Sequence, residues 1–286
     1  SKIVRSAIAF SNTQGGRIII GVSDDRNIVG IEGDPFKVRD QVVDMIINGC
    51  EPMISPESYV TTIDGKSLAV IEIPPGTSRP YYLKGGSPEK DAFLRTSASN
   101  RSPSEGMFKE LELEGARRSF DALKYIGECS TLDDDAEKLC RYLSRKSGKD
   151  VDLDKLVNLG LLENTRSGYI PSRGFMLLTS NPYYCARVEC ARFRGTNMNE
   201  FVDRKEFDGP LMDQIEEAVN FVMNNVNLAG VIKGLYREDI PEVPVEAVRE
   251  LITNAIIHRS YGMDNNHTFV GVFDDRIEIT SPGMMP

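Results

Sequence analysis

The stretch "AFSNTQGGRIIIGV" occupies residues 9–22 and decides how the chain begins to fold. Upstream of it, Ile3, Val4, Ala7 and Ile8 recur at helical spacing, and "SNTQGG" stops this helix. "RIIIGV" follows as a β-branched, apolar run of the kind found in buried strands. The sequence therefore predicts a helix, a glycine-containing turn and a strand in immediate succession.

The pattern of elements extends outward from this start. We expect a second strand at "IVGI", a helix at 35–49, and a hairpin made of "ESYVTTID" and "KSLAVIEIP". Later elements are helices near 132–146 and 152–160, a wing-like hairpin, a strand at "ARVECARFRG" and a helix from about 209. These patterns predict a multi-domain α+β protein, with domains at 1–115, 116–200 and 201–286.

Composition restricts the class of protein. Apolar residues make up 40% and charged residues 27% of the 286, and no apolar run reaches the length of a bilayer span, so we expect no membrane segment. The net charge of −9 excludes a surface that is basic throughout, so any contact with nucleic acid must be local. Five scattered cysteines without a Cys-x-x-Cys pair, and a start without a secretory signal, predict reduced thiols, no zinc and a cytoplasmic protein.

A second informative stretch is "ELITNAIIHRSY" at residues 250–261. As a helix it is predicted to bury Leu251, Ile252, Ala255 and Ile256. Polar residues recur at four-residue spacing along the edge of this apolar stripe: Glu250, Asn254 and His258. A carboxylate in such a seam can activate a water, and an amide oxygen one turn on can bind Mg²⁺, although the spacing also fits a solvated helix edge.

This helix and the following "DDRIEITSPG" resemble the start of the GHKL-type ATP-binding domain of gyrase B subunits and histidine kinases, and more closely a divergent branch often labelled transcriptional regulators or helicase-related proteins. The resemblance implies Glu250 as a water-activating base, Asn254 as the Mg²⁺ ligand, and His258, Ser281 and Gly283 at the nucleotide. Ser281 stands where the family has an Asp that accepts a hydrogen bond from the adenine amino group. The sequence also stops before the segment that forms the lid of the family's nucleotide site. ATP and Mg²⁺ are the implied cofactors, which we do not expect this chain alone to bind well.

Residues 77–104 form the most basic stretch of the first third of the chain. Its loops suit contacts with a nucleic-acid backbone, and a solvated loop is the alternative. The candidate DNA-binding side chains there are Arg79, Lys84, Arg95 and Arg101. In the earlier turn, Asn12 can hydrogen-bond the turn, while Gly15 and Gly16 can adopt conformations closed to other residues or offer backbone amides to a phosphate.

The sequence of residues 9–31, together with "FLRTSASN" further along the chain, resembles the Schlafen/AlbA-type DNA-binding domain. The two resemblances together imply a DNA-binding transcriptional regulator that responds to nucleotide, with DNA, nucleotide and further copies of the chain as partners. Two enzyme alternatives stand beside it, a GHKL-type ATPase and a Schlafen-like metal-dependent RNA nuclease. The nuclease would use Asp24 and Asp25, which also fit ordinary turn chemistry. We expect binding rather than catalysis to be the main activity.

Overall fold

The computed structural model describes residues 1–166, 168–233, 236–262 and 267–283. The chain divides into two compact units, Ser1–Arg118 (unit 1) and Ser119–Met285 (unit 2). Helix makes up 37% and strand 25%, spread over several small sheets, which confirms the predicted α+β class. The finer division into domains with boundaries at residues 115 and 200 stays a prediction.

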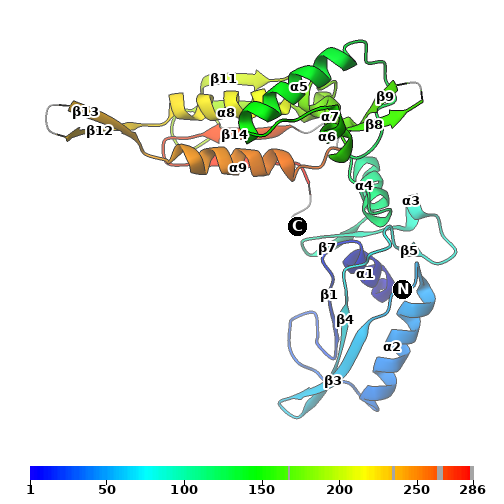
Figure 1. The fold of residues 1–286 in the computed structure, drawn as a ribbon. Helices are drawn as coiled ribbons and strands as arrows, with labels where there is room; N and C mark the ends of the chain where they lie inside the picture. The colour runs from blue at the N-terminus through cyan, green and yellow to red at the C-terminus, as the bar shows by residue number, and fades with distance from the viewer. Residues whose placement is uncertain (167, 234–235, 263–266, 284–286) are drawn as a thin grey trace. The chain divides into compact units, whose positions relative to one another are not determined.

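Unit 1 is a small α/β assembly built on a three-stranded antiparallel sheet with the order β1-β4-β3 (Figure 1). Two-stranded pairs, β2–β5 and β6–β7, complete its strands. Its elements are α1 Lys2–Ser11, β1 Gly16–Ile20, α2 Pro35–Gly49, β2 Cys50–Glu51, β3 Glu57–Ile63, β4 Lys66–Ile73, β5 Tyr82–Leu83, α3 Pro88–Asp91, β6 Leu94–Thr96, β7 Ser99–Arg101 and α4 Glu105–Gly115.

The core of unit 1 lies between the sheet and the helices α1 and α2. Ile8 of α1, Ile46 of α2 and Ile71 of β4 are all fully buried there. Asp34 caps α2 by accepting hydrogen bonds from two backbone amides, and Pro35 occupies the first helical position, where its missing N–H costs nothing. The predicted helices at the start of the chain and at 35–49 are thus confirmed.

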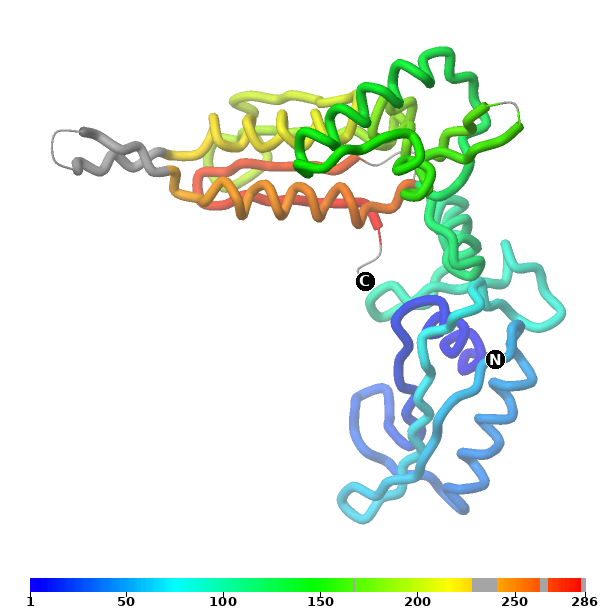
Figure 2. Tube along the Cα trace, in the orientation of Figure 1, coloured from blue at the N-terminus to red at the C-terminus, as the bar shows by residue number. Residues whose placement is uncertain are grey.

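Unit 2 contains a four-stranded sheet with the order β11-β10-β14-β15, in which β10 and β14 run parallel. Its helices α8 and α9 lie beside each other and share one apolar core with this sheet; they are yellow and orange in Figure 2. Its elements are α5 Leu132–Ser147, α6 Leu153–Asn158, β8 Leu162–Thr165, β9 Gly168–Pro171, α7 Arg173–Leu178, η1 Tyr184–Ala186, β10 Val188–Phe193, β11 Phe201–Phe207, α8 Leu211–Asn225, β12 Leu228–Lys233, β13 Tyr236–Pro241, α9 Val245–Ile257, β14 Thr268–Val272 and β15 Ile277–Thr280.

Two local predictions are wrong. The expected strand at "IVGI" is reduced to a single bridge between Val22 and Ile28, because Gly21 and Gly30 take positive φ angles of 103° and 83° that interrupt regular pairing. The expected burial of Leu251 fails as well: this side chain is 58% exposed, because α9 buries only a narrow stripe that includes Ile252 and Ile256.

Two general features of the chain can be read from the described residues. None of their helices combines the length and the apolar composition needed to cross a bilayer. The five cysteines are free in the structure, and burial raises the pKa of the Cys50 and Cys190 thiols to about 12. These two thiols therefore stay protonated at neutral pH.

Candidate nucleic-acid interface

The turn after α1 is held by the side chain of Asn12, which is fully buried. Its Nδ2 donates hydrogen bonds to the carbonyl oxygens of Tyr81 (2.7 Å) and Phe93 (3.0 Å), and its Oδ1 accepts one from the Tyr81 amide (2.7 Å). Asn12 therefore ties the end of α1 to the segments that lead into β5 and β6. Because its polar atoms are already bonded and buried, the Asn12 side chain has a structural role in this turn.

Gly15 and Gly16 are fixed by close packing. Gly15 has a φ of +79°, and a Cβ atom there would lie 2.6 Å from the carbonyl oxygen of Ile73. A Cβ atom on Gly16 would lie 2.6 Å from the ring of Phe10. The Gly15 amide already donates to the Phe10 carbonyl at 2.8 Å, so it is not free to hold a phosphate. Both glycines have a structural role in this turn.

Arg79 also serves this turn. Its Nε donates to the carbonyl oxygen of Ser11 (3.2 Å), and its guanidinium bonds the Thr13 carbonyl and pairs with Glu114 of α4. Only 16% of the Arg79 side chain is exposed. Its donors therefore satisfy carbonyl groups at the end of α1, and little of it faces solvent. By contrast, Lys84, which directly follows β5, is exposed.

Arg95 is positioned by contacts between α1 and β6, which pack together. Its guanidinium lies over the ring of Phe10, 5.4 Å from the centroid, while Arg5 of α1 lies over Phe93 at 5.3 Å. α1 and residues 93–95 thus exchange cation–π contacts, each supplying one arginine and one phenylalanine. Arg95 also donates to Asn100 Oδ1 (2.9 Å), which leaves the guanidinium oriented rather than loose.

The β6–β7 hairpin carries its two predicted arginines on opposite faces. Arg95 is paired across the strands with Asn100, whose Nδ2 donates to Ser6 Oγ of α1 at 2.9 Å. Arg101 is paired with Leu94, the residue next to Arg95. Because successive side chains of a strand point to opposite faces, Arg101 lies on the other side of the hairpin. The structure therefore brings Arg95 together with α1 and places Arg101 on the reverse of the same hairpin.

The resulting basic surface consists of Lys2 and Arg5 on α1 with Arg95 on the hairpin, while Arg101 lies on the reverse face of the hairpin. Lys2 and Arg5 are exposed and three residues apart, so they lie on the same side of α1. Neither residues 1–23 nor residues 92–104 contain an Asp or a Glu. None of the salt bridges found among the described residues involves this basic surface, and its arginines instead contact phenylalanine rings and Asn100.

Sequence reasoning missed Lys2 and Arg5 because they lie far from the basic stretch in the chain. Counting charges located Arg95 and Arg101, whereas the packing of α1 against β6 brings Arg5 to the face that carries Arg95. One signal was available: the absence of acidic residues from the whole first helix and turn, in a chain that carries 43 of them.

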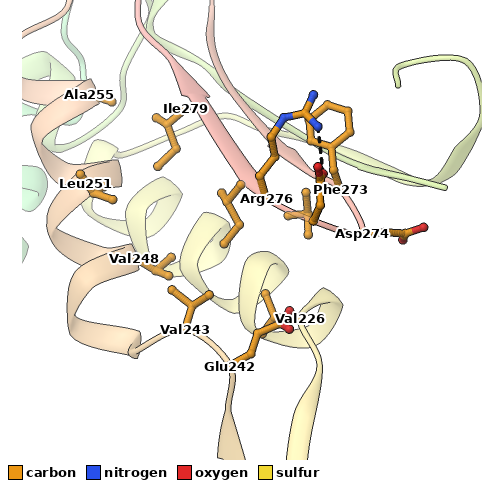
Figure 3. Close-up of a pocket in the computed structure, with 13 residues that line it drawn as sticks. Val226, Glu242, Val243, Val248, Leu251, Ala255, Phe273, Asp274, Arg276 and Ile279 are labelled. Atoms are coloured by element: carbon orange, nitrogen blue, oxygen red, sulfur yellow. Dashed lines mark hydrogen bonds and ion pairs between the residues drawn. The ribbon is translucent and has the colours of Figure 1, made fainter. Parts of the chain in front are cut away.

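Unit 2 contains a separate cavity of about 680 Å³ beside α9. Figure 3 shows Val248, Leu251 and Ala255 of α9 lining it opposite Ile279 of β15. Its remaining wall is mostly apolar, and its polar lining consists of Glu242, Asp274, Asp275 and Arg276. The predicted polar seam therefore runs next to a cavity, but Leu251 and Ala255, rather than their neighbours Glu250 and Asn254, form its wall.

The residues predicted to contact nucleotide lie around the end of α9. Glu250, Asn254 and His258 are exposed and do not line the cavity. Ser281 Oγ donates to the carbonyl oxygen of Ala255, a cavity residue, at 2.5 Å. Gly283 follows Pro282, whose carbonyl accepts a hydrogen bond from the Ser260 amide (2.7 Å). The segment after β15 is thus bonded to the end of α9.

The charged side chains around the cavity indicate whether ATP and Mg²⁺ fit there. Hydrogen bonds from Asn227 lower the pKa of Glu242, and Arg192 lowers the pKa of Asp274, so both rim carboxylates are ionised at neutral pH. Arg276 already pairs with Asp275 and Glu278. The apolar walls suit a flat ring, whereas Arg276, the cation in the lining, is already engaged by two carboxylates and offers little free charge to a triphosphate.

The nuclease alternative depends on Asp24 and Asp25, which are exposed in the turn after β1. Within the described residues, no three His, Cys, Asp or Glu side chains are grouped as a metal site would require. The structure thus adds no third ligand to the two aspartates.

Comparison with known proteins gives a match for the first part of the chain. Residues 1–104 match the Schlafen, AlbA_2 family model. This AlbA_2 match confirms the predicted Schlafen/AlbA resemblance, and it covers both α1 and the β6–β7 hairpin. The resemblance of residues 201–286 to the GHKL-type domain stays a prediction.

Two solved structures are similar. The DIP2311 protein from Corynebacterium diphtheriae is 21% identical over 100% of this chain, with a TM-score of 0.45. The chain spans 56% of the length of that protein. The N-terminal domain of an ATP-dependent DNA helicase RecG-related protein from Nitrosomonas europaea is 26% identical over 36% of this chain and 76% of its own, with a TM-score of 0.26. No curated protein matches.

Proposed function

We propose that this protein binds DNA through the basic surface of unit 1, the unit that contains the AlbA_2 match. One observation carries the proposal: α1 packs against the β6–β7 hairpin so that Lys2, Arg5 and Arg95 gather where the surrounding sequence has no carboxylate. The AlbA_2 match over the same residues supports it. We further propose that this DNA binding serves the regulation of transcription.

The chemistry of the basic surface favours contacts with the nucleic-acid backbone. Arginine forms paired, charge-assisted hydrogen bonds with phosphate oxygens, and neutralising phosphates releases condensed counterions. Hydroxyl and amide groups of Ser6 and Asn100 lie beside Arg95 and can extend such contacts. Because the whole chain carries a net charge of −9, acidic surface elsewhere restricts DNA to this location.

The exposed tip of the hairpin offers a route to sequence recognition. Residues 96–99 are all exposed, and they connect two strands that carry Arg95 and Arg101 on opposite faces. A two-stranded ribbon fits the major groove of B-form DNA, where base edges can be distinguished. Phosphate contacts by the arginines would position residues 96–99 in the groove. We propose that these residues recognise the DNA sequence.

Substitutions on the basic surface test the proposal. In the full chain, Arg5→Gln with Arg95→Gln is expected to weaken binding to a short labelled duplex about a hundredfold, at about tenfold for each lost phosphate contact. Fluorescence anisotropy at low salt measures this. The control is Lys37→Gln with Arg39→Gln on α2, which changes the net charge equally outside the basic surface. Equal losses in both double variants would refute the proposed location.

The ATPase and nuclease alternatives have no comparable support in the described residues. The cation that lines the unit 2 cavity, Arg276, is already paired with carboxylates, and Asp24 and Asp25 lack a grouped third ligand. Both alternatives predict chemistry on a nucleotide or RNA that depends on Mg²⁺ or Mn²⁺. Binding of DNA with no such turnover is the outcome that our proposal requires.

A further inference from the structure

Unit 2 holds another cavity, of about 310 Å³, which we call the aromatic pocket. Segments far apart in the chain line it: residues 120–127, the start of α7, the segment around η1 and the segment after α9. Among the described residues that line it, none is an Asp or a Glu. Half of these lining residues are aromatic, namely Phe120, Tyr125, Tyr183 and Tyr261.

The four rings of the aromatic pocket hold one another in place. Phe120 is stacked on Tyr261, with ring centroids 5.5 Å apart, and it meets Tyr183 edge-on at 5.3 Å. Tyr183 in turn meets Tyr125 edge-on at 6.4 Å. The Tyr261 hydroxyl donates to the carbonyl oxygen of Ile256 (3.0 Å), which ties this ring to the end of α9. The cluster therefore offers ring faces and ring edges in fixed positions, which suits a flat aromatic ligand.

Arg173, the first residue of α7, supplies a cation to the lining of the pocket. Its backbone amide donates to the Leu123 carbonyl at 2.7 Å, and its guanidinium lies over the Phe120 ring, 4.6 Å from the centroid. The salt bridges of the described residues engage other arginines of unit 2, such as Arg187 and Arg249, but not Arg173. Because the guanidinium stacks through its face, the N–H donors at its edge stay available to an anion.

The other charges close to the aromatic pocket also favour an anion. Asp121 follows Phe120 in the chain but does not line the pocket. Arg259 lies over the Tyr261 ring, 4.9 Å from the centroid, so a second arginine belongs to the same cluster. Burial raises the pKa of Tyr183 to about 12 and raises that of Tyr261 as well. Both phenols are therefore neutral at pH 7 and do not oppose a negative ligand.

We propose that the aromatic pocket binds a small aromatic carboxylate. The rings of the pocket contact the ring of the ligand, and Arg173 binds the carboxylate through paired, charge-assisted hydrogen bonds. The cavity has room for about ten non-hydrogen atoms, at about 30 Å³ for each atom of the size of a water molecule. This is the size of benzoate, and it is too small for a nucleotide. A cationic ligand, which a cluster of rings alone would suit, is repelled by Arg173.

Titration of the full chain with benzoate, followed through the proton NMR signals of benzoate, tests the site. The wild type is expected to bind with a dissociation constant on the order of 1 mM or tighter. Arg173→Gln is expected to weaken binding about tenfold or more, because the charge-assisted hydrogen bonds are lost. Arg145→Gln is the matched control, since Arg145 of α5 also lies over a ring, that of Tyr142, but outside the pocket. No saturable binding, or equal affinities in the two variants, would overturn the proposal.

Two further probes separate charge from ring contact. Benzamide has the shape of benzoate without its charge, and it is expected to bind about tenfold more weakly or worse. Acetate has the charge without the ring, and it is expected not to displace benzoate at the same concentration. Benzamide that binds as tightly as benzoate contradicts an anion site, and acetate that competes on equal terms contradicts contact with the rings.

Tyr125→Leu provides a second variant in case Arg173→Gln disturbs the start of α7. It keeps an apolar side chain but removes one ring, so benzoate is expected to bind about threefold to tenfold more weakly. Circular dichroism checks that each variant is folded. Wild-type affinity for benzoate in folded Tyr125→Leu would contradict the proposed position of the ligand. The aromatic pocket lies in unit 2 and the basic surface in unit 1, so this proposal and that of DNA binding fail separately.

Discussion

Replacing Asn12 with alanine is expected to lower the free energy of unfolding of unit 1 by about 4 kcal/mol, because it leaves buried backbone groups without partners. The amide and carbonyl of Tyr81 and the carbonyl of Phe93 lose their hydrogen bonds to this side chain. Urea unfolding followed by far-ultraviolet circular dichroism measures the change, read on the transition of unit 1 if the two units unfold separately.

The control for Asn12 is Asn48→Ala on α2, an exposed asparagine of the same unit. This change is expected to alter stability by less than about 0.5 kcal/mol. If Asn12→Ala also fell within that range while DNA affinity dropped sharply, Asn12 would be a binding residue and our structural assignment would be wrong.

Gly15→Ala is expected to destabilise unit 1 by about 3 kcal/mol or more. The added Cβ atom would lie 2.6 Å from the backbone carbonyl of Ile73, which cannot move without disturbing the β1–β4 pairing. The positive φ of +79° adds about 1 kcal/mol for any residue with a side chain. Thermal unfolding, compared with the wild type at the same pH, measures the loss.

Gly65→Ala separates the two causes. Gly65 has nearly the same φ, +76°, but a Cβ atom there would meet nothing within 4 Å. It therefore carries the conformational cost without the clash, and we expect about 1 kcal/mol of destabilisation. Equal losses at both glycines would show that the close approach to Ile73 contributes little.

Elements with a clear hydrophobic period were predictable from the sequence. The helix at 35–49 and the hairpin of β3 and β4 form where apolar spacing and turn residues placed them. The strand at "IVGI" was not predictable from its composition, because the conformations of Gly21 and Gly30 decided the path. Leu251 was misplaced because helical spacing gives the apolar side of α9 but not how much of it the sheet covers.

The candidate site was predictable only in part, for a similar reason. Charge counting separates basic from acidic stretches, but it cannot tell Arg79, whose donors bind backbone carbonyls, from Arg95, which is half-buried with its guanidinium over the Phe10 ring of α1. The bonds of Asn12 reach Tyr81 and Phe93, far along the chain, and no local pattern encodes such contacts. Arg5 joins the basic surface only through the packing of α1 on β6.

The salt dependence of DNA affinity tests the central claim most directly. For a protein that neutralises phosphates, the logarithm of the binding constant falls linearly with the logarithm of salt concentration, with a slope of about −0.9 per phosphate contact. For the full chain, Arg5→Gln with Arg95→Gln is predicted to make this slope shallower by about 2, while Lys37→Gln with Arg39→Gln leaves it unchanged. An unaltered slope in the Arg5 and Arg95 variant would contradict a basic surface built from α1 and the β6–β7 hairpin.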